Sequence, residues 1–435
     1  SREFSAGGLT LSIPGAGLGV QGAALGTGLA ESVAAAITLW YLFTRSSGLK
    51  IKAWRKSPSL PTPPIVRNSI RISLLTCAPG EEIYSLFGHT AIRYENPSQG
   101  IDIVFNYGLF SFNTPNFIFR FSLGETDYQL GATDYERFAA EYAFFGRSVW
   151  QQTLNLTDEE KTELIRLLQE NYRPENRVYR YNFFYDNCAT RPRDKIEESI
   201  AGKVIYPAEP QDGSLTFRDI VHQYCKGHPW ARFGIDLCIG SEADQPITQR
   251  QMMFAPFYLM DAFDGAQIKS DSIQRPLITA NELVVDATPE PDESGWMPTP
   301  LQCTLLLFIL TTAATIYGIR RRTGLWGIDL FLFGIAGIVG CVLAFLALFS
   351  QHPAVSSNFL LLVFHPGQLL FLPYIIYCVR KGKKCWYLTL NLIILTLFIV
   401  LFPVIPQRFD FAVVPLALVL LIRSASNLIV TSKKK

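Results

Sequence analysis

The segment VYRYNFFYDNCATRPRD, residues 178–194, contains the transition that decides the fold of the middle region. Its first eight residues alternate in a way that is typical of a β-strand. Asp186 and Asn187 follow, and both residue types cap helices, while Pro192 is tolerated in a first helical turn. The segment therefore predicts a strand that leads directly into a helix, with Cys188 at the junction.

This position makes Cys188 a candidate nucleophile. Backbone amides and the helix dipole at a helix start stabilise a thiolate, and the pKa of such cysteines falls from about 8.5 to between about 3.5 and 7.5. Two other interpretations stay open from the residues alone. The cysteine could pack as a small apolar side chain, or it could be one half of a disulfide.

A possible base and its orienting group lie upstream. His89 precedes a predicted strand at 90–95, and a short Asn-Pro-Ser-Gln-Gly turn joins this strand to another at 102–110. Antiparallel pairing would place Asn106 beside His89, with Tyr107 on the other side of the sheet. A cysteine nucleophile needs such a base, which a third polar group usually orients. A histidine that only packs in the core is the alternative.

The sequence around these segments is mixed in pattern. Residues 69–76 alternate as a strand, and Thr157 with Glu160 forms a capping box that starts a helix. We therefore expect an α+β domain over residues 65–285. A linker rich in Asp, Glu and Pro follows at 286–298.

Five apolar runs occupy the last third of the chain, and each reaches the roughly 20 residues that span a bilayer. Basic clusters follow the first, third and fifth runs, and the positive-inside rule places these clusters in the cytoplasm. The region before residue 299 is then outside, which in a bacterium is the periplasm. The sequence predicts a multi-pass inner-membrane protein with a transmembrane domain of five helices at 299–435. The runs are 299–319, 326–349, 358–379, 385–406 and 410–430.

The N-terminal segment, residues 1–58, disagrees with this topology. Its apolar run at 16–43 is followed by basic residues, which would place the next region in the cytoplasm. The opening Ser-Arg-Glu-Phe resembles a cloning scar. We expect this hydrophobic segment to be fusion-derived and dispensable. A native signal anchor with unusual flanks is the alternative.

Composition excludes some classes of protein. The 435 residues are 49% hydrophobic and 17% charged, which argues against disorder and against an ordinary cytosolic enzyme. The 39 Lys+Arg against 37 Asp+Glu leave a net charge of +2, so no strong field attracts nucleic acid, and none is expected as a partner. Eight cysteines are too few for a disulfide scaffold of this length.

Four residues near the end of the predicted α+β domain have a spacing that superficially suits zinc: His222, Cys225, His228 and Cys238. We favour a Cys225–Cys238 disulfide, which an oxidising periplasm permits. Free structural residues or a metal site are the alternatives. Neither a metal nor a cofactor is predicted.

Several motifs together resemble a known family. LFGHTAIRY (86–94), DIVFNYG (102–108) and RYNFFYDNCATRPRD (180–194) resemble the periplasmic domain of the Lnb lipoprotein N-acyltransferases. GIDLCIGSEAD and MFAPFYLMDAF resemble later blocks of that family, and the trailing apolar helices fit as well. The core also resembles a permuted NlpC/P60-type papain-like fold, in which the histidine strand precedes the cysteine helix.

The resemblance implies an α+β papain-like periplasmic domain followed by a five-helix transmembrane bundle. It also implies an acyltransferase that moves an acyl chain from a membrane phospholipid to the α-amino group of a diacylated lipoprotein cysteine. Cys188 matches the family's nucleophile and His89 its base, whereas Asn106 as third member is our own inference. We expect ping-pong chemistry through a Cys188 thioester, because a thioester can acylate an amine without ATP.

Other functions stay open at this point. The same Cys/His pair could serve a cysteine-dependent phospholipase or an NlpC/P60-like hydrolase, and in a membrane sensor or scaffold Cys188 would be structural. Five membrane helices favour a lipid substrate over murein but do not separate a transferase from a phospholipase.

Four residues are candidates for substrate binding. Arg191 or Arg193 could hold a lipid phosphate bidentately, although an ion-paired or solvated arginine is the commoner situation. Tyr107 is a third candidate. His365 precedes Pro366-Gly367, a predicted helix break in the third run, and could line an acyl-chain cavity or only pack between helices.

Overall fold

The computed structural model describes residues 3–6, 9–12, 70–110, 116–125, 127–207, 215–270, 274–287 and 297–432. It divides into two compact units. The first unit holds residues 1–65 and 290–299, and its described part is a hairpin of β1 (Glu3–Ala6) and β2 (Leu9–Ser12). The predicted N-terminal span at 16–43 and most of the predicted linker at 286–298 lie outside the described residues. The second unit holds residues 66–289 and 300–435.

A seven-stranded antiparallel sheet organises the α+β part of the second unit. Its strand order is β12-β7-β3-β4-β5-β6-β8. The strands are β3 (Arg71–Cys77), β4 (His89–Asn96), β5 (Ile101–Leu109), β6 (Asp127–Asp134), β7 (Val149–Leu154), β8 (Val178–Arg180) and β12 (Ile278–Val285).

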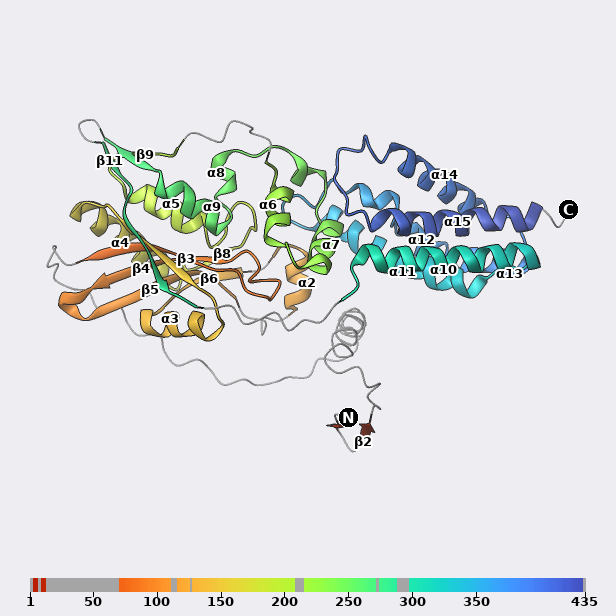
Figure 1. The fold of residues 1–435 in the computed structure, drawn as a ribbon, viewed down its shortest axis with the longest axis horizontal. Coiled ribbons are helices and arrows are strands. Elements are labelled where there is room, and N and C mark those ends of the chain that lie inside the picture. Colours follow the sequence, from red (N-terminus) through yellow and green to blue (C-terminus); the bar gives the residue numbers. More distant parts are fainter. Residues whose placement is uncertain are drawn as a thin grey trace. The chain divides into compact units, whose positions relative to one another are not determined.

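Helices cover both faces of this sheet (Figure 1). α3 (Tyr135–Phe144) packs its buried Phe138 and Tyr142 against one face. α4 (Asp158–Tyr172), α5 (Thr190–Ser199) and α9 (Pro256–Asp264) lie on the other. The predicted capping box starts α4: Glu160 N–H donates to Thr157 Oγ1 at 3.3 Å, and Thr157 N–H donates to Glu160 Oε2 at 2.8 Å.

A second, mainly helical layer completes the α+β part. It contains a small three-stranded sheet and an aromatic cluster in which Phe184 stacks on Phe217 at 4.2 Å. Its elements are β9 (Lys203–Ile205), α6 (Phe217–Tyr224), α7 (Pro229–Cys238), η3 (Ser241–Asp244), α8 (Gln249–Met252), β10 (Gln267–Lys269) and β11 (Gln274–Pro276).

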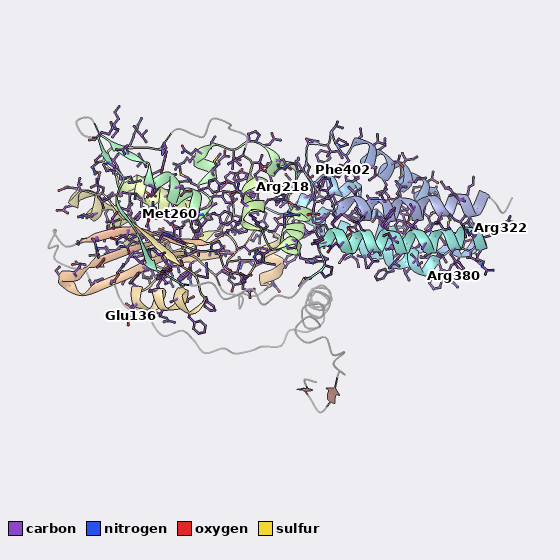
Figure 2. The ribbon with its side chains drawn as sticks, viewed as in Figure 1. Glu136, Arg218, Met260, Arg322, Arg380 and Phe402 are labelled. Carbon is purple, nitrogen blue, oxygen red and sulfur yellow. The ribbon has the colours of Figure 1, made fainter. Side chains whose placement is uncertain are left out.

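The C-terminal part is helical and apolar, which confirms the predicted architecture. Three helices are long and apolar enough to cross a membrane: α10 (Pro300–Arg321), α11 (Trp326–Phe349) and α15 (Val413–Ser432). The labelled side chains Arg322 and Arg380 lie at the same end of this bundle (Figure 2), as the positive-inside rule requires of two predicted cytoplasmic loops.

The other two predicted runs are helical but differ from simple spans. The third run forms η4 (Phe359–Leu362), α12 (Gly367–Leu370) and α13 (Leu372–Lys381), with a bend of 73° at Phe371. Pro373 cannot donate the hydrogen bond that would continue the helix, which explains the break. α14 (Trp386–Leu401) has only 16 residues, and Pro403, which has no backbone N–H to donate to the preceding turn, follows its end. The described chain therefore has three spans, or four if the bent segment counts as one.

Candidate active site

Asn187 fixes the junction that carries Cys188. Its side-chain Oδ1 accepts hydrogen bonds from the N–H groups of Ala189 (2.8 Å) and Thr190 (3.0 Å), so it caps the start of α5 as the sequence predicts. Its Nδ2 donates to the carbonyl oxygen of Phe254 at 2.9 Å, which ties the junction to the aromatic cluster. Cys188 is therefore held in the turn that leads directly into α5.

His89 and Asn106 meet on neighbouring strands. In the β4–β5 register Ala91 lies opposite Asn106, so His89, two residues earlier, shares the face of Asn106. His89 Nε2 lies 2.5 Å from Asn106 Oδ1. Because an amide oxygen only accepts hydrogen bonds, Nε2 carries the proton and Nδ1 is left as the basic nitrogen. The predicted contact between these two strands is present.

Gly108 brings the cysteine and the histidine together, and the sequence analysis did not identify it. It has φ +87°, and a Cβ atom added there would lie 3.4 Å from Cys188 Cβ and 3.9 Å from His89 Cε1. Both side chains therefore border the same point, with no side chain of residue 108 between them. A register shift between Asn106 and Leu109 marks a bulge here, and a glycine inside a strand is the sequence signal for it.

Burial sets the protonation of the pair. It raises the pKa of the Cys188 thiol to about 11, although the backbone N–H groups of Thr90 and Cys188 donate to the sulfur and act in the opposite direction. Burial also lowers the pKa of His89 to about 4, against the hydrogen bond to Asn106. Both groups are thus neutral near pH 7. Desolvation thus opposes the thiolate that the helix start favours, and the role of Cys188 as nucleophile stays a prediction.

Two protein-family models match the chain, one in each of its two main parts. The model of the Lnb N-terminal periplasmic domain matches residues 64–222, and the model of the Lnb transmembrane domain matches residues 292–435. Together the two matches cover well over half of the chain. The chain belongs to the Lnb family of lipoprotein N-acyltransferases. It is thus a membrane protein with a periplasmic domain. Neither a curated protein nor a solved structure gives a significant match.

Aromatic side chains surround the thiol of this Lnb protein. Burial raises the pKa of Tyr128 to about 12, and the neighbouring Cys188 adds to the shift when it is charged. Burial raises the pKa of Tyr179 and Tyr181 as well, and a charge on Cys188 raises both further. The rings of Tyr128 and Tyr181 stack at 4.2 Å. Three tyrosines therefore lie near the candidate nucleophile, which is itself partly exposed.

The two arginines predicted to bind phosphate in the Lnb protein are engaged with protein groups. Arg191 donates to both carboxylate oxygens of Asp186 at 2.6 and 2.7 Å and lies over the ring of Tyr179 at 3.6 Å. Arg193 is buried and donates to Asp194 Oδ1 and to the carbonyl oxygen of Arg250. The ion-paired alternative is the one found, and a phosphate would have to displace a carboxylate.

The other two predicted binding residues make contacts within the protein, Tyr107 fully buried and His365 partly buried. Tyr107 is fully buried, and its hydroxyl donates to Asn171 Oδ1 on α4 at 2.8 Å. His365 contacts Asn391 Oδ1 at 3.2 Å within the Lnb transmembrane domain. A Cβ on Gly340 of α11 would lie 2.5 Å from the backbone nitrogen of His365, so the bent segment packs directly on α11. Their roles in binding stay predictions.

The predicted Cys225–Cys238 disulfide is wrong. Both thiols are free, because Cys225 is buried in the aromatic cluster while Cys238 ends α7. His222 does not join them, since its Nε2 contacts both carboxylate oxygens of Asp236 at 2.9 Å. Among the described residues, no group of three or more His, Cys, Asp or Glu side chains could hold a metal ion.

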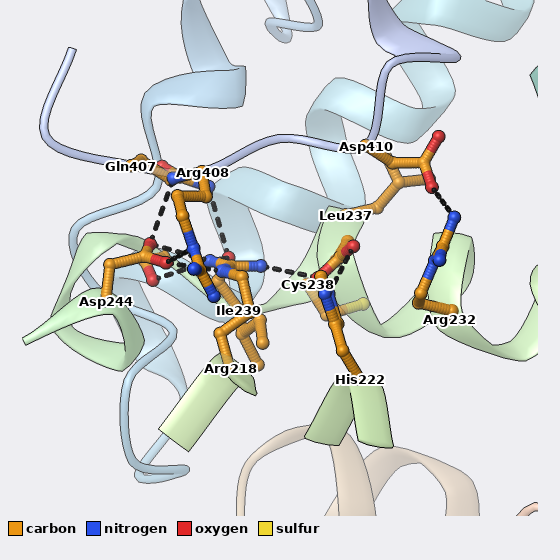
Figure 3. A network of polar contacts seen from close by, with 12 residues as sticks. Arg218, His222, Arg232, Leu237, Cys238, Ile239, Asp244, Gln407, Arg408 and Asp410 are labelled. Atoms are coloured by element: carbon orange, nitrogen blue, oxygen red, sulfur yellow. Dashed lines mark hydrogen bonds and ion pairs between the residues drawn. The ribbon is translucent and has the colours of Figure 1, made fainter. Parts of the chain in front are cut away.

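A buried network of ion pairs and hydrogen bonds, rather than a disulfide, connects the elements of this region (Figure 3). Arg218 is fully buried where the α+β part meets the helices (Figure 2), and its guanidinium donates to Asp236 (2.6 Å) and Asp244 (2.8 Å). Arg408, from the loop between α14 and α15, donates to Asp219 (2.5 Å) and Asp244 (3.3 Å). The network thus joins the periplasmic domain to a loop of the transmembrane domain. No sequence signal indicates it, because its members are up to 189 residues apart.

Proposed function

We propose that this Lnb protein transfers an acyl chain from a membrane phospholipid to the α-amino group of a diacylated lipoprotein cysteine, with a Cys188 thioester as the intermediate. The observation that carries the proposal is the convergence of Cys188, His89 and Asn106 around Gly108. The donor is a lipid because the same chain carries helices that cross the membrane.

The first half-reaction forms the thioester. His89 Nδ1 takes the thiol proton as Cys188 Sγ attacks the ester carbonyl carbon of the phospholipid, which forms a C–S bond and a tetrahedral oxyanion. The oxyanion collapses, the ester C–O bond breaks, and the departing alkoxide takes the proton back from His89. The products are an acyl-cysteine and a lysophospholipid. Asn106 keeps the imidazole proton on Nε2 throughout, so that Nδ1 stays free to accept a proton.

The second half-reaction consumes the thioester. The α-amino group of the lipoprotein cysteine attacks the thioester carbonyl, His89 accepts a proton from the amine, and the C–S bond breaks. The thiolate then takes the proton from His89, which restores the neutral pair. The tyrosine rings near Cys188 offer apolar surface for the acyl chain of the thioester, and aminolysis rather than hydrolysis is the outcome that the proposal requires.

Arg191 is the better of the two candidates for the donor phosphate. Its side chain is 24% exposed, whereas that of Arg193 is 7% exposed and bonded to backbone. Asp186, its present partner, is itself 38% exposed and can turn to solvent when a phosphate binds.

The test is a trapped intermediate. Purified protein mixed with phospholipid alone should gain the mass of one acyl chain at Cys188, and addition of a diacylated lipopeptide should remove that mass and lengthen the peptide by one acyl group. Cys188→Ala should abolish both signals. Cys238→Ala, which removes a free thiol outside the site, should abolish neither.

Two outcomes would contradict the proposal. Normal lipopeptide acylation by Cys188→Ala would exclude the thioester. Release of free fatty acid without acylation of the lipopeptide would identify a phospholipase.

A further inference from the structure

The short helix α2 (Phe117–Ser122) carries two exposed aromatic side chains of the periplasmic domain. Phe119 is 58% exposed and Phe121 is 45% exposed, two residues apart in a six-residue helix, and the Phe121 ring also lies 5.2 Å from that of His352. An apolar surface of this kind marks an interaction site in a soluble domain. Phenylalanine and other aromatic side chains also recur where helices lie in the boundary between lipid headgroups and acyl chains.

α2 is attached to the end of a membrane-spanning helix. The carbonyl oxygen of Leu123 accepts from Gln351 N–H at 2.8 Å, and the carbonyl oxygen of Phe121 contacts His352 Nε2 at 2.5 Å. Gly124, with φ +73°, makes this attachment possible, because a Cβ there would lie 2.8 Å from the backbone nitrogen of His352. The position of α2 relative to the end of α11 is therefore fixed by backbone contacts.

The aromatic surface of α2 continues onto the surface of α11. The rings of Phe119 and Phe345 lie 5.8 Å apart, and those of Phe345 and Phe349 lie 5.7 Å apart. Phe349 is 64% exposed and Leu348 is 74% exposed, on a span with a mean hydropathy of 2.6. In a bilayer these outward side chains of α11 face lipid. The row from Phe119 to Phe349 is thus one apolar surface shared by the two domains.

A second exposed aromatic lies on α7, which also contacts the membrane helices. Trp230 is 43% exposed, and its ring lies 6.3 Å from Phe233, which packs against the core of the helical bundle. Tryptophan is enriched at the level of the lipid headgroups. α7 and α2 therefore both present aromatic side chains next to the membrane-spanning helices.

We infer that α2 inserts Phe119 and Phe121 into the leaflet that faces the periplasmic domain, and that the occupant of this surface is membrane phospholipid. The continuity with the lipid-facing side of α11 favours a bilayer over a protein partner. α2 also connects β5 and β6, the strands that carry Asn106, Gly108 and Tyr128 around Cys188. The inserted helix thus lies in the connection between two strands of the candidate site.

The inference does not depend on thioester chemistry, so it can be tested in a Cys188→Ala background. The photoreactive phenylalanine analogue p-benzoylphenylalanine replaces Phe119 in the full chain, in nanodiscs of phosphatidylethanolamine and phosphatidylglycerol. Illumination should add the mass of one phospholipid to the protein. The same analogue at Phe349 is the positive control. At Phe144, which is 79% exposed on α3, it is the negative control and should give no lipid adduct.

Three results would overturn the inference. The first is no lipid adduct at position 119 when position 349 gives one. The second is a covalent dimer, which would assign the surface to a second copy of the chain. The third is an adduct that forms only after a diacylated lipopeptide is added, which would assign the surface to the acceptor. If position 119 disturbs folding, the analogue at Phe121 provides the same comparison.

Discussion

Replacing Asn106 by Asp places a negative charge beside the base. The present amide oxygen lies 2.5 Å from His89 Nε2, which puts a new carboxylate charge roughly 4 Å from the centre of an imidazolium. At an effective dielectric constant of about 20, this pair is worth about 4 kcal/mol, or about 3 pKa units. Desolvation of the carboxylate offsets part of this, so we expect the pKa of His89 to rise by about 2 units from its value of about 4.

The consequence is a shift in the pH dependence of thioester formation. A general base works only when it is neutral, and His89 with a pKa of about 4 is neutral at every pH well above that value. The unmodified protein should therefore form the acyl adduct at a constant rate above about pH 5, whereas the Asn106→Asp variant should lose rate as the pH falls through about 6.

The assay is single-turnover adduct formation with phospholipid, followed by intact-protein mass spectrometry at a series of pH values. Asn106→Ala is the matched control, because it removes the acceptor without adding a charge. It should slow adduct formation at every pH, since the proton is no longer held on Nε2. The pH at which the rate falls on the acid side should be the same as in the unmodified protein. If the rate falls at the same pH in the Asn106→Asp variant and in the unmodified protein, His89 is not the titrating base.

Two further predictions test the packing around the site and between the domains. Gly108→Ala should cost about 1–2 kcal/mol of stability because of its positive φ, and should also slow adduct formation because its methyl group lies between Cys188 and His89. Gly227→Ala, with φ +94° and open space around it, should lower the melting temperature similarly without slowing the reaction, and equal rates in both variants would contradict this. Arg218→Ala should lower the free energy of unfolding by about 3–5 kcal/mol, because it leaves buried carboxylates unpaired. Arg166→Ala, on the exposed face of α4, should leave chemical denaturation unchanged.

Features that depend on neighbouring residues were predictable from the sequence. The helix cap at Asn187 follows from residue type, and the contact between His89 and Asn106 follows from strand alternation across one short turn. The architecture of an α+β domain before apolar helices follows from the distribution of hydrophobic residues in the same way.

Features that depend on long-range packing were not predictable. The sequence indicated a position that favours a thiolate at Cys188, because a helix start is visible in sequence, whereas the burial that opposes it is not. It paired Cys225 with Cys238 by proximity in the chain, whereas the structure buries Cys225 in a core and links the region through Arg218. The early end of α14 is a different case, because Pro403, two residues beyond it, is a local signal that the analysis of apolar runs did not use.

The neutral state of Cys188 has a consequence for its survival in an oxidising compartment. Peroxides, disulfides and alkylating reagents react with thiolates, and burial raises the pKa of the Cys188 thiol to about 11, which favours the protonated form at pH 7. The same burial therefore slows sulfenic acid formation and mixed disulfides at the resting nucleophile. In the proposed mechanism, sulfur becomes reactive only while an acyl ester is bound and His89 withdraws the proton.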